Sequence, residues 1–448
     1  MRFVPEVNWP RLVKGSCMKD KSESIVDVSP DIRAGRNRLA VTVILGHAVK
    51  HLFNSALPIL LPLMKIDKGL SVKQYGALFT ARNMTSGGTT MVAGYLGERF
   101  ANRSGAMLFI SLALMGVSYF LLGVAPNFFW IVAAILLVGI GPSLYHPPAI
   151  ASLSRKFPDR RGFAISLHGT GGSIGEVLGP LIVGLITTET FKVGSIITFT
   201  YLIAFQWDEV FRISVVPAMV FAVLVYLMMR NIPSVATDSG SLKEYFGGLG
   251  DLLKEWGMLG LIAVTALRSM GQSAIQSFLL LYLMSPMEEG GLGKTALVAG
   301  LFISTSQAVG IFAQPVMGWV SDRYGRKIVL VPSMAALGVL FIALNYASDG
   351  YQLWLNVLVM GAFVYSLHTI FIAAAMDVAG GKAQSTVVSL IYGASFLGSF
   401  SPYIAAMIVD EFGLRSAFLY SGFMVILATL LLATLKLPSS GTRQGLPH

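Results

Sequence analysis

The chain has 448 residues, of which 54% are hydrophobic and 12% are charged, and its formal net charge is +10. A soluble domain usually carries about 25% charged residues, so this composition excludes an ordinary soluble protein and favours one embedded in a lipid bilayer. The basic residues form no stripe with interleaved aromatic side chains on a soluble module, which argues against binding to nucleic acid.

The N-terminal residues 1–38 are polar and basic and lack the apolar core of a signal peptide, which predicts a cytoplasmic tail. Cys17 is the single cysteine, which excludes an internal disulfide framework and a paired-cysteine metal site. A membrane-spanning helix needs about 20 mostly apolar residues. This length predicts an all-α membrane protein with twelve spans, at residues 39–63, 74–97, 104–124, 128–152, 163–188, 210–230, 257–284, 296–319, 328–347, 352–375, 386–409 and 416–436.

Two further features bear on the predicted topology: the stretch 189–209 and the distribution of basic residues. Residues 189–209 are apolar in the middle but too short for an obvious further span, so they form either a long external loop or an extension of the fifth helix. Most basic residues fall on one side of the predicted membrane, and four of them crowd one short loop: Arg155, Lys156, Arg160 and Arg161. Basic loops face the cytoplasm, so we expect a multi-pass protein of a bacterial-type inner membrane with both termini cytoplasmic.

The polar stretch 231–256 separates the first six spans from the last six. It predicts five parts: a tail at 1–38, a six-helix bundle at 39–230, a cytoplasmic linker at 231–256, a second bundle at 257–436 and a tail at 437–448. The two bundles are related in sequence. His146 and His368 follow similar residues half a chain apart, and Gly175 and Pro180 correspond to Gly398 and Pro402. The chain is therefore a tandem repeat of six helices.

A second repeated motif lies at the ends of spans two and eight, where residues 94–103 read GYLGERFANR and residues 318–327 read GWVSDRYGRK. The second copy resembles the signature loop of the major facilitator superfamily through Gly318, Asp322, Arg323, Gly325, Arg326 and Lys327. The first copy keeps Gly94, Glu98 and Arg99 but departs from the pattern at Ala101 and Asn102. The resemblance implies the twelve-helix, two-bundle fold of that family, and a loop that helps to hold one conformational state. The alternative is that both loops only mark the cytoplasmic side.

The segment 142–185, from the end of span four through span five, resembles the fosmidomycin-resistance branch of the superfamily, with a His-Pro pair, a basic loop and a glycine-rich helix. Gly175, Gly179, Pro180 and Gly184 also resemble the antiporter motif of drug exporters, although Val183 replaces one glycine. This resemblance favours export over import. Ordinary packing of helices through small residues explains the glycines nearly as well.

Ionisable side chains inside a span are costly and tend to face a functional cavity. Five of the six histidines fall in predicted spans, and histidine titrates near neutral pH, which suits proton transfer. We expect proton coupling at Glu176, His146, His168 and His368. His47 and His51 have a spacing that can chelate a metal, but Lys50 on the same helix face would repel a cation, so no metal site is expected. Histidines that merely bond to a neighbouring helix are the other alternative.

The basic groups inside the spans predict an anionic substrate. Lys50 and Arg268 lie on corresponding helices of the two halves and are expected to face each other across a central cavity. The arrangement is similar to that of the organophosphate antiporters of the superfamily. An arginine offers a planar fork for a carboxylate or phosphonate. The expected substrate-binding residues are Lys50, Arg82, Arg268, Gln272, His47 and His51, the alternative being that the arginines only bridge helices.

The sequence therefore predicts a monomeric secondary transporter that moves a small anionic compound against protons by rocking of its halves, without a cofactor. The resemblance favours an antiporter for efflux and drug resistance. An importer or exchanger of anionic metabolites is the nearest alternative. A non-transporting receptor is a further one, and no motif of an enzyme active site is present.

Overall fold

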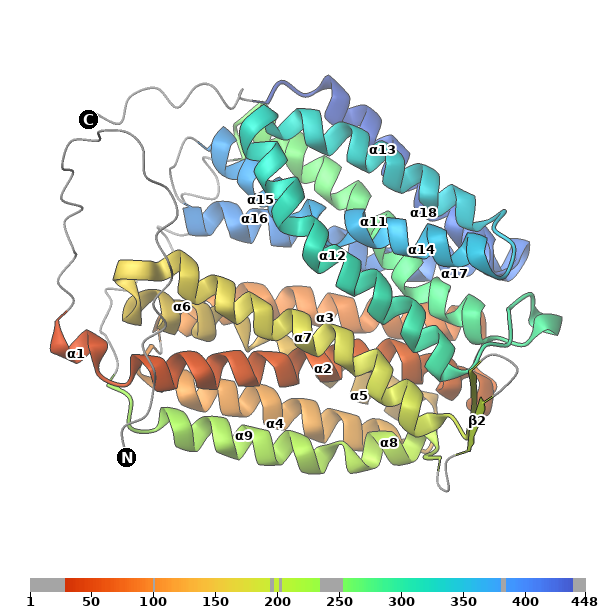
Figure 1. Ribbon diagram of the computed structural model, residues 1–448, viewed down its shortest axis with the longest axis horizontal. Coiled ribbons are helices and arrows are strands. Elements are labelled where there is room, and N and C mark those ends of the chain that lie inside the picture. The colour runs from red at the N-terminus through yellow and green to blue at the C-terminus, as the bar shows by residue number, and fades with distance from the viewer. Residues whose placement is uncertain are drawn as a thin grey trace.

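A computed structural model describes residues 29–99, 101–193, 197–200, 204–233, 253–379 and 384–437. Most of the predicted N-terminal tail, of the predicted linker and of the predicted C-terminal tail lies outside these residues. Helices make up nearly all of the structure, and in Figure 1 the helices of the first half lie below those of the second.

The first half begins with the short helix α1 (Pro30–Arg33) and the first long helix α2 (Arg36–Lys68). The elements that follow are α3 (Val72–Arg99), η1 (Ala101–Arg103), α4 (Ser104–Gly123), α5 (Phe128–Ser143), α6 (His146–Lys156), η2 (Pro158–Arg160), α7 (Arg161–Thr187), β1 (Thr190–Val193), β2 (Ile197–Thr200), α8 (Trp207–Ile213) and α9 (Val215–Met229).

The second half begins with α11 (Trp256–Met284) and the short turn η3 (Met287–Glu289). The elements that follow are α12 (Ala296–Tyr324), α13 (Arg326–Leu344), α14 (Tyr351–Val364), α15 (Leu367–Val378), α16 (Gln384–Leu397), η4 (Gly398–Phe400), α17 (Ser401–Phe412) and α18 (Ser416–Thr434).

The structure confirms the predicted all-α membrane architecture. Within the described residues, eleven helical segments are long and apolar enough to cross a bilayer. The remaining predicted span is α3, whose 28 residues include Arg82, Asn83 and many small polar residues. Because α3 packs against α5 in its own half and against α17 in the other, polar side chains on it can face protein instead of lipid.

Three predicted spans are interrupted, which corrects their prediction as continuous helices. Span four breaks between α5 and α6, span ten between α14 and α15, and span eleven at η4. In span four the cause is local: Pro147 and Pro148 lack the N–H groups that would bond to the carbonyls of Ser143 and Leu144. Span ten breaks at the repeat-related place without a proline.

The stretch after α7 forms a β-hairpin and not an extension of the fifth helix. Strands β1 and β2 pair antiparallel, with Thr190 opposite Thr200. The hairpin marks one end of the molecule, called here the hairpin end, and α1 marks the opposite α1 end (Figure 1). At the α1 end, helix α2 begins at Arg36, inside the predicted tail, because Lys156 fixes the preceding turn by donating to the carbonyls of Asp31 and Ala34.

Glycines allow the helices within each half to pack closely, and the pattern repeats. Gly139 of α5 lies against the backbone of α3 at Arg82, and Gly361 of α14 lies against the backbone of α12 at Ser306. The two glycines hold corresponding places in the two halves. At both places the neighbouring backbone leaves no room for a side chain. The repeat that the sequence indicated therefore extends to these packing contacts.

The two halves meet near the hairpin end. The Tyr75 hydroxyl donates to the carbonyl of Ser277 across 2.8 Å, and this contact is buried. Lys73 of α3 forms an ion pair with Asp410 of α17 at 2.7 Å. Helices α7 and α12 also touch closely, since a Cβ added to Gly300 would lie 2.5 Å from the carbonyl oxygen of Pro180. In Figure 1 the halves converge toward the side of β2, so the structure is a state closed at the hairpin end.

Candidate functional site

Four of the five predicted intramembrane histidines gather in the first half. His47 and His51 come from α2, His146 is the first residue of α6, and His168 comes from α7. The rings of His47 and His168 stack with centroids 3.7 Å apart, and the ring of His146 lies 4.8 Å from His47 at a steep angle. Tyr145 stacks on the same group, 5.9 Å from His47, and its hydroxyl donates to the carbonyl of Val43.

Lys50 and Glu176 complete a connected row of ionisable groups. The Lys50 amine lies 2.8 Å from Nε2 of His146 and 3.2 Å from Nε2 of His51. Nδ1 of His51 lies 2.8 Å from the carboxylate of Glu176. If Lys50 donates to both rings, the Nδ1–H of His51 is free to donate to Glu176, so these partners set the tautomer of His51. The row joins α6, α2 and α7 without a gap.

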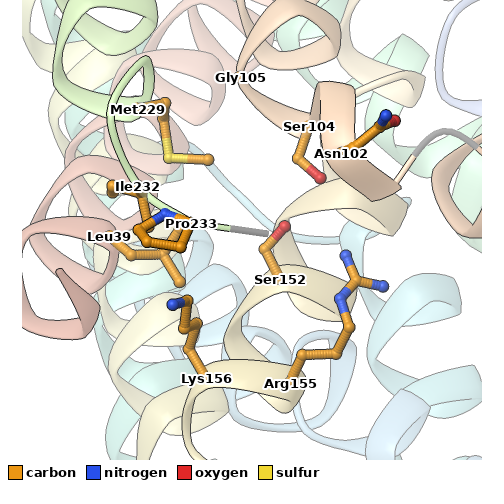
Figure 2. A pocket seen from close by; sticks show the side chains of 10 residues that line it. All are labelled: Leu39, Asn102, Ser104, Gly105, Ser152, Arg155, Lys156, Met229, Ile232 and Pro233. Carbon is orange, nitrogen blue, oxygen red and sulfur yellow. The ribbon is translucent and has the colours of Figure 1, made fainter. Parts of the chain in front are cut away.

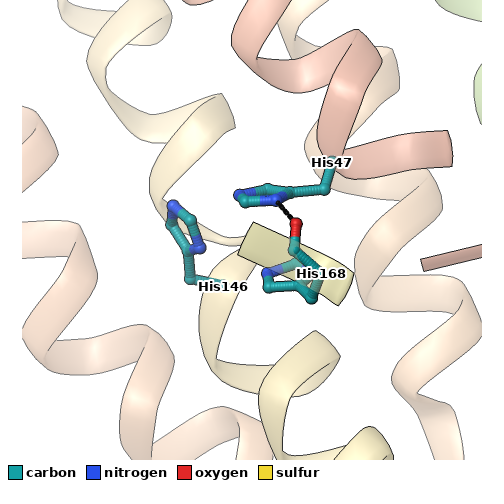
Figure 3. A group of neighbouring side chains, drawn as sticks. All are labelled: His47, His146 and His168. Atoms are coloured by element: carbon teal, nitrogen blue, oxygen red, sulfur yellow. Dashed lines mark hydrogen bonds between the residues drawn. The ribbon is translucent and has the colours of Figure 1, made fainter. Parts of the chain in front are cut away.

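Three of these histidines lie close enough to suggest a metal site. The ring nitrogens of His47, His146 and His168 are all within 4.8 Å of one another, and Figure 3 shows the three rings turned toward a common point. However, Nδ1 of His47 donates to the carbonyl of His168 at 2.6 Å, and Nε2 of His146 is held by the Lys50 amine. An ammonium group this close to the three rings repels a bound cation, which argues against a metal ion at this place.

Arg82 lies on α3 and reaches toward α2. One of its NH₂ groups donates to the side-chain oxygen of Asn54, and the other donates to that of Asn83 at 3.2 Å. Its Nε is buried without a partner. Sequence reasoning missed Asn54, although an amide one helical turn from Lys50 was a signal that it shares the same helix face.

Arg268 and His368 form a separate group in the second half. The side chain of Arg268 is buried, and its guanidinium donates to the Gln272 side-chain oxygen at 2.5 Å and lies 5.3 Å from the ring centre of Phe371. His368 packs against Tyr392, with ring centroids 5.0 Å apart. Among the described residues, His368 makes no hydrogen bond or ring contact with the first-half histidines. That Lys50 and Arg268 face each other across a cavity stays a prediction.

The second-half loop motif forms a compact charge network at the α1 end. Arg326 donates to Asp377 at 2.9 Å, to Ser321 at 2.8 Å and to Asp322. Gly325 turns the chain between α12 and α13 with a φ of 108°, which favours glycine. Lys327 caps α18 through the carbonyls of residues 433 and 435, and Arg323 lies over the ring of Trp319. In the first-half copy, Gly94 and the side chains of Glu98 and Arg99 lie outside the part of the chain whose surroundings the structure describes.

A small pocket of about 50 Å³ lies at the α1 end of the first half, between α2, α4, α6 and the residues that follow α9. Figure 2 shows its wall, which includes Ser152, Arg155 and Lys156, with Lys156 near Leu39. None of the predicted substrate-binding residues lines it. We therefore place the candidate site at the ionisable groups inside the two halves.

Comparison with known proteins identifies relatives that are similar in sequence over most of the chain. The "Fosmidomycin resistance protein" of Escherichia coli (strain K12) is 22% identical over 435 residues, which cover 94% of this chain and 98% of that protein. The "Multidrug resistance protein MdtG" of Yersinia enterocolitica is 24% identical over 344 residues, covering 74% of this chain and 76% of the relative. An uncharacterised transporter of Bacillus subtilis, YfnC, is 22% identical and covers 89% of this chain and 93% of the relative.

Solved structures share the fold. A bacterial homologue of the human lysosomal transporter Spinster, in an inward-facing conformation, has a TM-score of 0.68 at 17% identity and covers 90% of this chain and 98% of its own. A D-xylose–proton symporter has a TM-score of 0.66 at 16% identity, with 90% and 98% covered. The family model described as "Major Facilitator Superfamily" matches residues 43–298 and 261–447. The chain is a multi-pass membrane protein that belongs to the major facilitator superfamily.

Proposed function

We propose that the protein is a proton-coupled antiporter that exports a small anionic organic compound by alternating access. The state of its two intramembrane arginines carries this proposal. Arg268 is buried and Arg82 is partly buried, and both donate to neutral amides. In the part of the chain that the structure describes, neither forms an ion pair with a carboxylate. A positive charge away from water calls for an anion, and a bound substrate can supply it.

The row of Lys50, His51 and Glu176 supports proton coupling. When the Lys50 ammonium gives a proton to Nε2 of His51, Nδ1 of His51 can release one to Glu176, and both ends of the row become neutral. The side chain of Glu176 is 35% exposed, compared with 13% for His51, so protons reach the row most easily at Glu176. This transfer leaves the total charge of the row unchanged but removes the positive charge from its Lys50 end. The position of the proton along the row is therefore linked to how strongly Lys50 attracts an anion.

The orientation of the chain completes the proposal. We place the α1 end in the cytoplasm, where the basic loop with Arg155 and Lys156 lies, so the end at which the halves are closed faces the outside. Relatives named for resistance to fosmidomycin and to multiple drugs support export as the direction. Fosmidomycin is a phosphonate, and we propose it as the first substrate to test, with a monomer as the working unit.

Arg268→Gln is expected to weaken anion transport strongly. Loss of charge-assisted hydrogen bonds to the substrate should raise the KM for fosmidomycin roughly ten- to hundredfold, because each such bond contributes about 1.5–3 kcal/mol. The measurement is uptake into proteoliposomes with a pH gradient imposed in each direction. Arg212→Gln is the matched control, because Arg212 pairs with Asp208 at the exposed surface of α8.

The same assay can contradict the proposal in two ways. If Arg268→Gln transports fosmidomycin, benzoate and other anions as the wild type does, the anionic substrate class is wrong. If collapse of the pH gradient leaves transport unchanged, the coupling to protons is wrong. Uptake driven only from the outside to the cytoplasmic side would identify an importer.

A further inference from the structure

The helices that follow the two repeat-related breaks, α6 and α15, differ in the number of backbone N–H groups in their first turn. In the first half, His146 is followed by Pro147 and Pro148, which have no N–H groups. At the corresponding places in the second half, His368 is followed by Thr369 and Ile370, which keep theirs. The first amides of a helix have no partner within it and attract negative charge. Only α15 therefore begins with a full set of amide donors.

No side chain in the described part of the chain caps the start of α15. The residue before it, Ser366, makes no capping bond, because its hydroxyl donates backward to the carbonyl of Ala362. The Thr369 hydroxyl likewise donates to the carbonyl of Ser366. Neither hydroxyl oxygen accepts from an amide at this end of α15, so among the described residues these amides have no side-chain acceptor.

Arg268 is fixed between the two ends of the break. Its partner Gln272 donates to the carbonyl of Val364, the last residue of α14, at 3.4 Å. Its guanidinium lies over Phe371, in the second turn of α15. The Arg268 side chain is 3% exposed, and its Nε has no hydrogen-bond partner. A guanidinium is thus buried beside an uncapped helix start.

His368 adds one more polar group without a hydrogen-bond partner. Its Nε2 is buried without a partner, while its ring packs against Tyr392. A neutral imidazole can carry its proton on this nitrogen and then donate it. Arg268, His368 and the first amides of α15 are all donors, and no carboxylate of the described residues pairs with Arg268. In the first half, by contrast, the donor Lys50 is matched by the acceptors His146 and His51 and by Glu176 beyond them.

We propose that the break between α14 and α15 binds the oxyanion head of the substrate, a carboxylate or phosphonate, through Arg268, His368 and the first amides of α15. His368 is then a substrate-binding residue. His146, its repeat-related counterpart, instead belongs to the row that it forms with Lys50, His51 and Glu176, called here the proton row. The charged head of the anion and the row of Lys50, His51 and Glu176 then lie in different halves. This inference rests on the proposed transport of an anion and adds where its charged head lies.

Thr369→Pro tests the amide donor directly. Proline occupies the corresponding place in the first half, so this backbone accommodates it there, and the change removes one N–H from the site. We expect phenylphosphonate to bind purified protein about tenfold or more weakly, as measured by calorimetry, because a hydrogen bond to a charged group is lost. Thr369→Val is the matched control: it loses the same hydroxyl but keeps the amide, and its affinity should stay within twofold of the wild type.

A second variant and a second ligand keep the test independent of folding. His368→Phe preserves a planar ring without a donor and should also weaken phenylphosphonate binding severalfold, while His368→Gln should retain part of it. The neutral diethyl ester of phenylphosphonate should not distinguish the wild type from Thr369→Pro. Unchanged melting temperatures in the absence of ligand establish that each variant is folded.

Two results would overturn the inference, and they can be told apart. If Thr369→Pro and His368→Phe bind phenylphosphonate as the wild type does while Lys50→Met abolishes binding, the anion head lies in the first half. The proposed anion transport would then stand without this site. If the wild type neither binds nor transports phenylphosphonate, benzoate or fosmidomycin, the proposed function and this inference both fail.

Discussion

Glu176→Gln is expected to abolish export driven by a pH gradient while exchange of substrate for substrate across the membrane continues. The Glu176 carboxylate is 2.8 Å from Nδ1 of His51 and is the more exposed end of the proton row. Glutamine keeps the size and the hydrogen bond but cannot take up a proton. Accumulation against a gradient should therefore fall to the level of protein-free liposomes.

Proteoliposomes loaded with unlabelled substrate provide the measurement. Gradient-driven accumulation and counterflow exchange of labelled fosmidomycin are recorded on the same preparation. Glu189→Gln is the control, because Glu189 is exposed just beyond the end of α7, near the hairpin end. If Glu176→Gln still concentrates the substrate under a pH gradient, the proton row does not carry the coupling. If exchange is lost as well, Glu176 is needed for more than the proton.

Gly300→Ala is expected to shift the protein out of the state closed at the hairpin end. A Cβ at this position would lie 2.5 Å from the carbonyl oxygen of Pro180 in the other half, so α7 and α12 would have to separate. Overpacking of this kind costs about 1–3 kcal/mol, which changes the ratio of two states by roughly 5- to 150-fold. Gly76→Ala should act in the same direction, since its Cβ would meet Ala406 and the carbonyl of Pro402.

Chemical labelling distinguishes the two states. A cysteine replacing Ser277, whose carbonyl accepts from Tyr75 at the closed interface, should react with a membrane-impermeant maleimide from the hairpin side much faster in Gly300→Ala. Gly88→Ala is the control, because a Cβ there meets no atom within 4 Å. Equal labelling rates in both backgrounds would mean that the contact between α7 and α12 does not set the closed state.

Much of the architecture follows from local sequence, because a spanning helix needs only length and apolar character. The interruption of span four had a local signal that the prediction of a continuous helix overlooked, since two successive prolines cannot complete helical hydrogen bonds. The interruption of span ten has no local signal: Tyr365 is pressed against Gly310 of α12, and Gly361 against Ser306. The repeat could have revealed it, because His146 and His368 mark corresponding places. The β-hairpin was missed because a short apolar stretch also fits a loop or a helix extension.

The sequence could indicate the residues of the candidate site but not the contacts between them. Charge and position in a span were enough to select Lys50, Arg268 and the histidines. Which of them touch depends on how far each helix is rotated and where it breaks, and these are set by packing across the bundle. His51 therefore connects Lys50 to Glu176 as a neighbour in space, although it was predicted only as a substrate ligand. His368 corresponds to His146 in the sequence repeat, but its neighbours are different, namely Arg268 and Tyr392.

The contacts that close the hairpin end differ in how they respond to dissolved ions. Lys73 and Asp410 are 49% and 42% exposed, so external salt weakens their attraction. The bond from Tyr75 to Ser277 is buried and is shielded from such screening. With the hairpin end placed outside, as proposed, a higher external ionic strength is expected to make this end open more readily without changing the binding groups.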